Sequence, residues 1–107
     1  MIKPFIVMPR ELERYQYFVE IVLESSSGKR DARISDISGG GCYIDSIASA
    51  HEGDEVSFEL KDIDHQNLTF TGTVAYVLEG MGFGIKFTNV TDKHQAVIDQ
   101  ILKSSGG

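Results

Sequence analysis

The sequence predicts an all-β fold in which six short antiparallel strands form a small barrel or sandwich, followed by one helix. Six segments place apolar residues at every second position, as half-buried strands do, and turn-like segments separate them. One segment near the end has helical periodicity instead, and the sequence lacks the helical crossovers that parallel βαβ units require. At 107 residues, the chain is expected to form one domain spanning residues 1–107.

The first three predicted strands follow one another closely. Residues 17–23 alternate between apolar and polar, and the following "ESSSGK" has the composition of a turn. The return strand "RDARISDI", residues 30–37, places Ala32 and Ile34 on one face. The first two segments therefore predict a hairpin, and "GCYIDS" begins a third strand after three glycines.

The last three predicted strands show the cleanest alternation. They are "EVSFELK" at residues 55–61, "NLTFTGTVAYV" at 67–77 and "GFGIKF" at 82–87. Their shared apolar faces consist of Val56, Phe58 and Leu60; Leu68, Phe70, Gly72, Val74 and Tyr76; and Phe83, Ile85 and Phe87.

The two ends of the chain depart from the strand pattern. In "TDKHQAVIDQILKS", Thr91 is a suitable N-cap, and one helical face carries Val97, Ile98, Ile101 and Leu102. Residues 1–16 fit neither period, and Pro9 isolates "RELER". We therefore expect a flexible arm over residues 1–16, a β-domain over 17–90 and a helix over 91–103.

Charge and composition exclude several classes of protein. The net charge is −6 and the pI is near 4.9, which argues against broad binding to DNA or RNA backbones. Because residues 1–33 carry a net charge of +1 and the remainder −7, a compact anion site near the N-terminus is still compatible with the sequence. Without an apolar run of the required length, no membrane insertion is expected. The single Cys42 fits a reducing compartment, and we predict a cytoplasmic protein with no secretion signal.

Catalytic and metal sites are not predicted. "DISGGG" resembles the Asp-Ser-Gly-Gly of trypsin-like proteases, but no histidine stands in a triad signature, so Ser38 is interpreted as a turn residue. The histidines His51, His65 and His94 lack ligand spacing with one another or with Cys42. "EGMGFGIKF" precedes a strand rather than a helix, which excludes a dinucleotide loop. The chain is expected not to be an enzyme and to need no cofactor.

Two polar groups of residues could bind a guanine nucleotide. Arg10 and Arg14 are four positions apart, and the arginine fork suits phosphate oxygens or the O6/N7 edge of guanine. Asp36 can accept hydrogen bonds from N1 and N2 of guanine, Ser38 adds a hydroxyl, and Gly41 belongs to a run of glycines that lets a ligand approach the backbone. In the alternative to nucleotide binding, both arginines are solvated and Asp36 caps a turn.

Taken together, these residues resemble the motifs of the PilZ domain, a bacterial receptor for cyclic di-GMP. The motifs are R-x-x-x-R at Arg10 and Arg14, and D-x-S-x-x-G at Asp36, Ser38 and Gly41. The resemblance also covers the "GTVAYV…GMGFGIKF" segment and the C-terminal helix, and it implies a six-stranded antiparallel β-barrel of PilZ type. It further implies that both arginines clamp the ligand while the turn contacts a guanine.

The resemblance also implies how such a receptor acts. Arm closure over cyclic di-GMP would relay the signal to an unidentified downstream protein. Pro9 stands where many PilZ domains carry another arginine that influences whether one or two ligands bind. Two alternatives are an adaptor that contacts proteins without a nucleotide, and a single-stranded nucleic acid binder that uses Phe83 and Phe87.

Overall fold

The computed structural model describes residues 15–46 and 50–106. The elements run in the order β1 (Tyr15–Ser25), β2 (Gly28–Ile37), β3 (Gly41–Asp45), β4 (Glu55–Lys61), β5 (Asn67–Leu78), β6 (Gly82–Thr88) and α1 (Asp92–Gly106). The expected arm, with Arg10 and Arg14, therefore lies outside the described residues except for its last two positions, which belong to β1.

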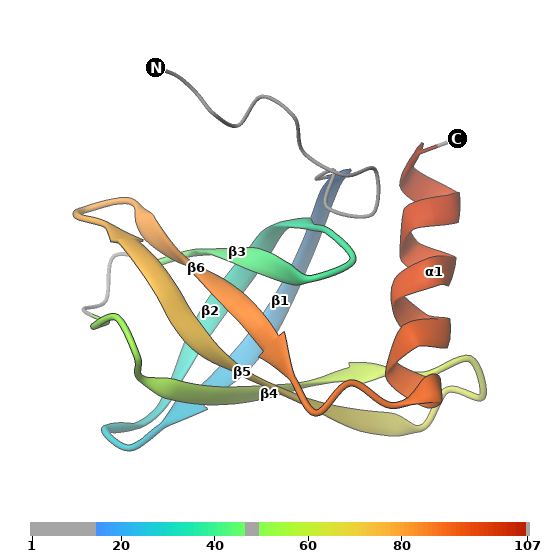
Figure 1. The fold of residues 1–107 in the computed structure, drawn as a ribbon, viewed down its shortest axis with the longest axis horizontal. Helices are drawn as coiled ribbons and strands as arrows, with labels where there is room; N and C mark the ends of the chain where they lie inside the picture. The colour runs from blue at the N-terminus through green and yellow to red at the C-terminus, as the bar shows by residue number, and fades with distance from the viewer. Residues whose placement is uncertain (1–14, 47–49, 107) are drawn as a thin grey trace.

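The six strands form a closed barrel in which every neighbouring pair is antiparallel. Their order around the barrel is β1-β2-β3-β6-β5-β4, so the β3–β6 junction lies across the barrel from the β4–β1 junction. Helix α1 stands beside the barrel, and β1 and β4 diverge from the point where they meet (Figure 1). The predicted six-stranded antiparallel barrel with one C-terminal helix is confirmed.

Alternation along the strands places one apolar face of each in a common core. Three phenylalanines contact one another in this core: Phe58 and Phe70 are stacked with ring centroids 5.6 Å apart, and Phe87 is tilted against Phe70 at 5.6 Å. Cys42 is fully buried in the same core, as expected of a small packing residue. The buried apolar residues are Ile21, Leu23, Ile34, Ile37, Cys42, Ile44, Val56, Phe58, Leu60, Phe70, Val74, Phe83, Ile85, Phe87, Val97, Ile98 and Ile101.

Helix α1 begins with the predicted N-cap. The Thr91 hydroxyl accepts a hydrogen bond from the backbone N–H of His94 at 3.4 Å, while Nδ1 of His94 accepts from the backbone N–H of Thr91 at 3.1 Å. The other ring nitrogen of His94 lies 2.7 Å from the carbonyl oxygen of Thr69. His94 thus joins the start of the helix to strand β5.

Three details of the prediction change. Strand β1 begins at Tyr15 rather than at residue 17, and α1 continues to Gly106 rather than ending at 103. The predicted face of β5 is wrong at Tyr76, because the β5–β6 register shifts between Val74 and Tyr76. After this bulge, Val77 packs against the core and the Tyr76 ring lies over Gly84 on the outer surface.

Candidate functional site

The turn between β2 and β3 is held by the hydroxyl of Ser38. Its Oγ accepts hydrogen bonds from the backbone N–H groups of Gly40 at 3.3 Å and Gly41 at 3.2 Å. The Ser38 N–H donates to the Gly41 carbonyl at 2.8 Å, and the side chain is only 5% exposed. A short hydroxyl side chain is needed here because it reaches backbone groups two and three residues ahead. The turn is therefore fixed by its own hydrogen bonds.

Gly41 is required by space rather than by an unusual backbone angle. Among the described glycines, positive φ occurs at Gly28, Gly53, Gly80 and Gly82, and so not in the three-glycine turn. A Cβ on Gly41 would collide with the carbonyl oxygen of Ile85 on strand β6. The neighbouring Gly40 carbonyl accepts a hydrogen bond from the N–H of Phe87 at 2.9 Å. These contacts seat the turn tightly on β6.

Asp36 begins a row of outward-facing positions across four strands. The register pairs Asp36 with Tyr43, Tyr43 with Gly84, and Gly84 with Tyr76. The Tyr43 and Tyr76 rings are tilted with their centroids 6.3 Å apart. Because a glycine in the middle leaves room for the Tyr76 ring, the row forms an aromatic outer surface with a carboxylate at one end. We call these four residues the outer row.

The hydroxyl of Tyr43 is the chemically unusual group of the outer row. Its oxygen is buried and has no hydrogen-bond partner, the one such side-chain atom among the residues the structure describes. Burial raises the pKa of this phenol first, followed by the nearby groups of Tyr76, Asp45 and Asp36. The phenol stays protonated at neutral pH and remains a hydrogen-bond donor without an acceptor.

Arg33 extends the polar surface along β2. Its guanidinium donates a hydrogen bond to Asp45 at 2.5 Å and lies 5.1 Å from the ring centroid of Phe18. Arg33 and Asp36 both face outward because the β2–β3 register shifts between Ile34 and Asp36, and Arg33 lies at the end of the ladder away from the turn, opposite Asp45. The ion pair and the cation–π contact hold the guanidinium in place.

The structure brings together part of the site that the sequence predicts. Asp36, Ser38 and Gly41 lie within one strand end and turn, whereas Arg10 and Arg14 fall outside the described residues. Ligand contact by any of the five stays a prediction. Sequence reasoning missed the outer-row tyrosines, because the bulge before Tyr76 reverses its face and Tyr43 is recognised only by its cross-strand register.

The two phenylalanines that the nucleic-acid alternative requires are buried. Phe83 and Phe87 are 2% and 7% exposed, so they are core residues and cannot stack bases on the surface. The described parts of the chain contain no group of three or more His, Cys, Asp or Glu able to hold a metal ion. Within these residues, no helix has the length and apolar character to cross a membrane.

The chain is thus a small closed barrel of six antiparallel strands whose β2–β3 turn is held by a buried serine. The family model for the PilZ domain matches residues 9–104, so the chain belongs to the PilZ domain family. PilZ domains are receptors for cyclic di-GMP and are generally non-catalytic. The match spans both predicted motifs.

A solved structure supports the fold. The chain is similar to the PilZ domain of CeSA from a cellulose-synthesizing bacterium, with a TM-score of 0.63 and 16% sequence identity. The alignment covers 86% of this chain and 97% of that domain. At this identity the likeness establishes a shared fold. Comparison with curated proteins gives no match.

Proposed function

We propose that this chain binds cyclic di-GMP at the β2–β3 turn and acts as a non-catalytic receptor. The observation that supports it most is the hydrogen-bonded turn at Ser38 and Gly41, which presents Asp36 at a rigid strand end in a chain of the PilZ family. A site whose geometry is set before binding loses less entropy when the ligand arrives.

In this proposal, each motif residue has a distinct task. The Asp36 carboxylate accepts from N1 and N2 of a guanine, a pair of donors that adenine lacks. Ser38 and Gly41 act mainly by holding the turn, as their present hydrogen bonds and close contact do. Arg10 and Arg14 supply the positive charge for the phosphates.

The proposed output is a change in the N-terminal arm. The arm would close over the nucleotide as its arginines engage the phosphates, and the new surface would contact a downstream protein. Since one ligand carries two phosphates, binding should weaken with salt, but less steeply than for a protein that covers many phosphates.

Isothermal titration calorimetry tests the proposal. Cyclic di-GMP should bind the wild-type chain, cyclic di-AMP should bind at least about tenfold more weakly, and Arg14→Ala and Asp36→Ala should each lose about tenfold or more in affinity. Arg30→Ala is the matched control, because Arg30 contacts Ser27 at the far end of β2. Absence of heat with the wild type, or equal affinities for wild type and Arg14→Ala, would refute it.

A further inference from the structure

The barrel is closed least completely between β1 and β4. The ladder between these strands consists of two residue pairs, Glu24 with Ser57 and Ser25 with Val56. Beyond them, β4 continues through Phe58–Lys61 and β1 extends back to Tyr15, with no further pairing between the two in the described chain. Figure 1 shows the strands diverging from this contact. We call the diverging part the β1–β4 seam.

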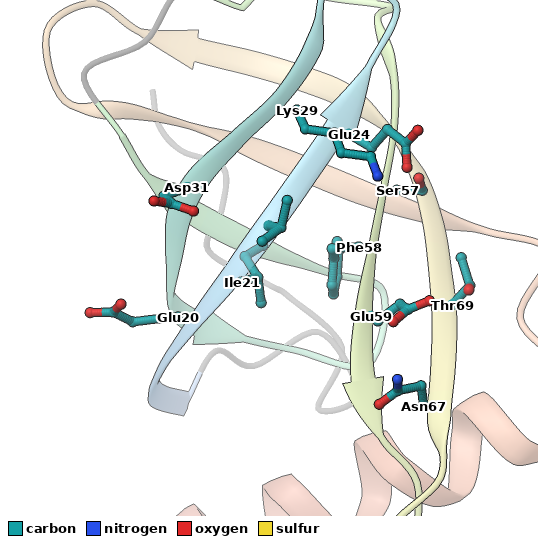
Figure 2. Close-up of a pocket in the computed structure, with 11 residues that line it drawn as sticks. Glu20, Ile21, Glu24, Lys29, Asp31, Ser57, Phe58, Glu59, Asn67 and Thr69 are labelled. Carbon is teal, nitrogen blue, oxygen red and sulfur yellow. The ribbon is translucent and has the colours of Figure 1, made fainter.

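A cavity of about 570 Å³ lies in the seam. Its lining residues come from both sides of the seam and from the adjoining strands; they are Glu20, Ile21, Val22, Glu24, Lys29, Asp31, Ser57, Phe58, Glu59, Asn67 and Thr69. Figure 2 shows Phe58 between the ribbons of β1 and β4, Ile21 against the β1 ribbon, and Glu59 and Thr69 on the β4–β5 side. The Ile21 and Phe58 side chains belong to the core, at 7% and 2% exposure, and form the inner wall of the cavity between the two strand edges.

The rim of the cavity is acidic. It carries four carboxylates against the single ammonium of Lys29, and none of the four forms an ion pair with another described residue. Lys29 stands directly opposite Glu24 in the β1–β2 ladder and offsets that charge. Arg33 likewise stands opposite Glu20, so Asp31 and Glu59 are the rim carboxylates without a cation directly opposite them in a ladder.

Unpaired strand edges and an acidic rim together define the occupant. An extended peptide can hydrogen-bond to an exposed strand edge, and its side chains then alternate between the two faces. For a strand that enters between the two edges, the inward-facing side chains would join the core at Ile21 and Phe58, and the outward-facing ones would meet the carboxylates. We propose that the β1–β4 seam binds an extended segment of a partner protein in which basic and apolar residues alternate, by adding it as a strand.

The same features argue against other occupants. The carboxylates repel an anionic nucleotide, and a second copy of the chain would bring the same carboxylates to the seam. The stretch of β1 from Glu20 to Glu24 spans about 16 Å at the usual rise per residue, enough for a segment of four or five residues. The seam also lies across the barrel from the β3–β6 junction, so the inference does not rest on nucleotide binding.

A peptide titration followed by NMR tests the proposal. The probe is acetyl-Lys-Val-Lys-Val-Lys-amide, added to the ¹⁵N-labelled chain. Its saturable binding should shift the amides of Ile21–Leu23 and Phe58–Leu60 and slow their hydrogen exchange. The same peptide N-methylated at both valines keeps its charge but loses backbone donors, and it should bind about tenfold more weakly.

Matched variants separate the seam from general acidity. The double variant Glu20→Gln/Glu59→Gln should lose about fivefold or more in affinity for the lysine peptide. Glu52→Gln/Glu79→Gln removes the same charge from exposed loop positions and should bind as the wild type does. Shifts spread over the whole acidic surface, equal binding of the N-methylated peptide, or no seam shifts at millimolar peptide would each overturn the proposal.

Discussion

The β3–β6 junction and the β1–β4 seam lie across the barrel from each other and are built in opposite ways. At the junction, five consecutive residue pairs run from Gly41–Lys86 to Asp45–Gly82. At the seam, two pairs close the barrel. At the junction, the backbone N–H and C=O groups are paired with one another, so that surface offers a ligand side chains such as Asp36 and Tyr43. At the seam, where the strands diverge, backbone N–H and C=O groups are available for hydrogen bonds to another chain. The first arrangement suits a small planar ligand and the second suits a polypeptide.

The largest effect is expected from breaking the tight junction at Gly41. In Gly41→Ala, the new methyl group meets the rigid backbone carbonyl of Ile85, so the free energy of unfolding should fall by about 3 kcal/mol. Gly28→Ala is the comparison, because a Cβ there meets no atom within 4 Å and costs only backbone strain at φ 114°, about 1–2 kcal/mol. Urea denaturation measures both, and a Gly41→Ala protein as stable as wild type would contradict the close contact.

Removing the hydroxyl that locks the turn should have the next largest effect. Ser38→Ala deprives the N–H groups of Gly40 and Gly41 of their side-chain acceptor, which should cost about 1–2 kcal/mol of unfolding free energy. Ser57→Ala, at the β1–β4 seam, serves as the control and should change stability by less than about 0.5 kcal/mol. Equal losses at both serines would show that the turn is not specially held.

Removing the Tyr43 hydroxyl, which has no hydrogen-bond partner, should increase stability rather than decrease it. Tyr43→Phe removes a buried donor without an acceptor, so the unfolding free energy should rise by up to about 1 kcal/mol. Tyr17→Phe is the control, because the Tyr17 hydroxyl is not one of the buried groups that lack a hydrogen-bond partner. Its unfolding free energy should stay within about 0.5 kcal/mol of that of the wild type. Thermal and urea unfolding test the pair, and a clear destabilisation by Tyr43→Phe would mean that this hydroxyl has a partner.

The smallest effect concerns acid stability at the β4–β5 turn. The pKa of Asp62 is lowered, first by the hydrogen bond from the Gln66 N–H at 2.9 Å and also by that from the Asp64 N–H at 2.8 Å. Because the folded-state pKa lies below the usual value of about 3.9, the ionised carboxylate stabilises the fold above that pH. This contribution is lost as the pH falls through the folded-state value.

Asp62→Asn isolates this contribution. The amide keeps an oxygen acceptor for the turn but does not titrate, so the unfolding free energy of the variant should fall less steeply below about pH 4 than that of wild type. Urea titrations between pH 5 and about pH 2 give the two slopes. If the unfolding free energies of the two proteins fall equally steeply with decreasing pH, Asp62 does not contribute to acid stability.

The barrel was predictable from the sequence because period-two alternation, as at Val56, Phe58 and Leu60, is recognisable in the strands despite the register shifts in three of the ladders. The helix was predictable because Thr91 and the apolar face coincide. The site was predictable only in part. Asp36, Ser38 and Gly41 form a local motif, whereas the place of Tyr76 depends on a one-residue bulge that no local pattern marks. The seam was not predicted, because strand divergence arises from the barrel as a whole.

An NMR titration of the ¹⁵N-labelled chain with cyclic di-GMP shows which of the two surfaces binds the nucleotide, since it reports both at once. Saturable shifts are expected for the amides of Asp36–Gly41 and for those of Lys86 and Phe87, which lie against the turn. The amides of Ile21–Leu23 and Phe58–Leu60 in the seam should stay unchanged. No shifts at all, or shifts centred on the seam, would contradict the assignment of the nucleotide to the β2–β3 turn.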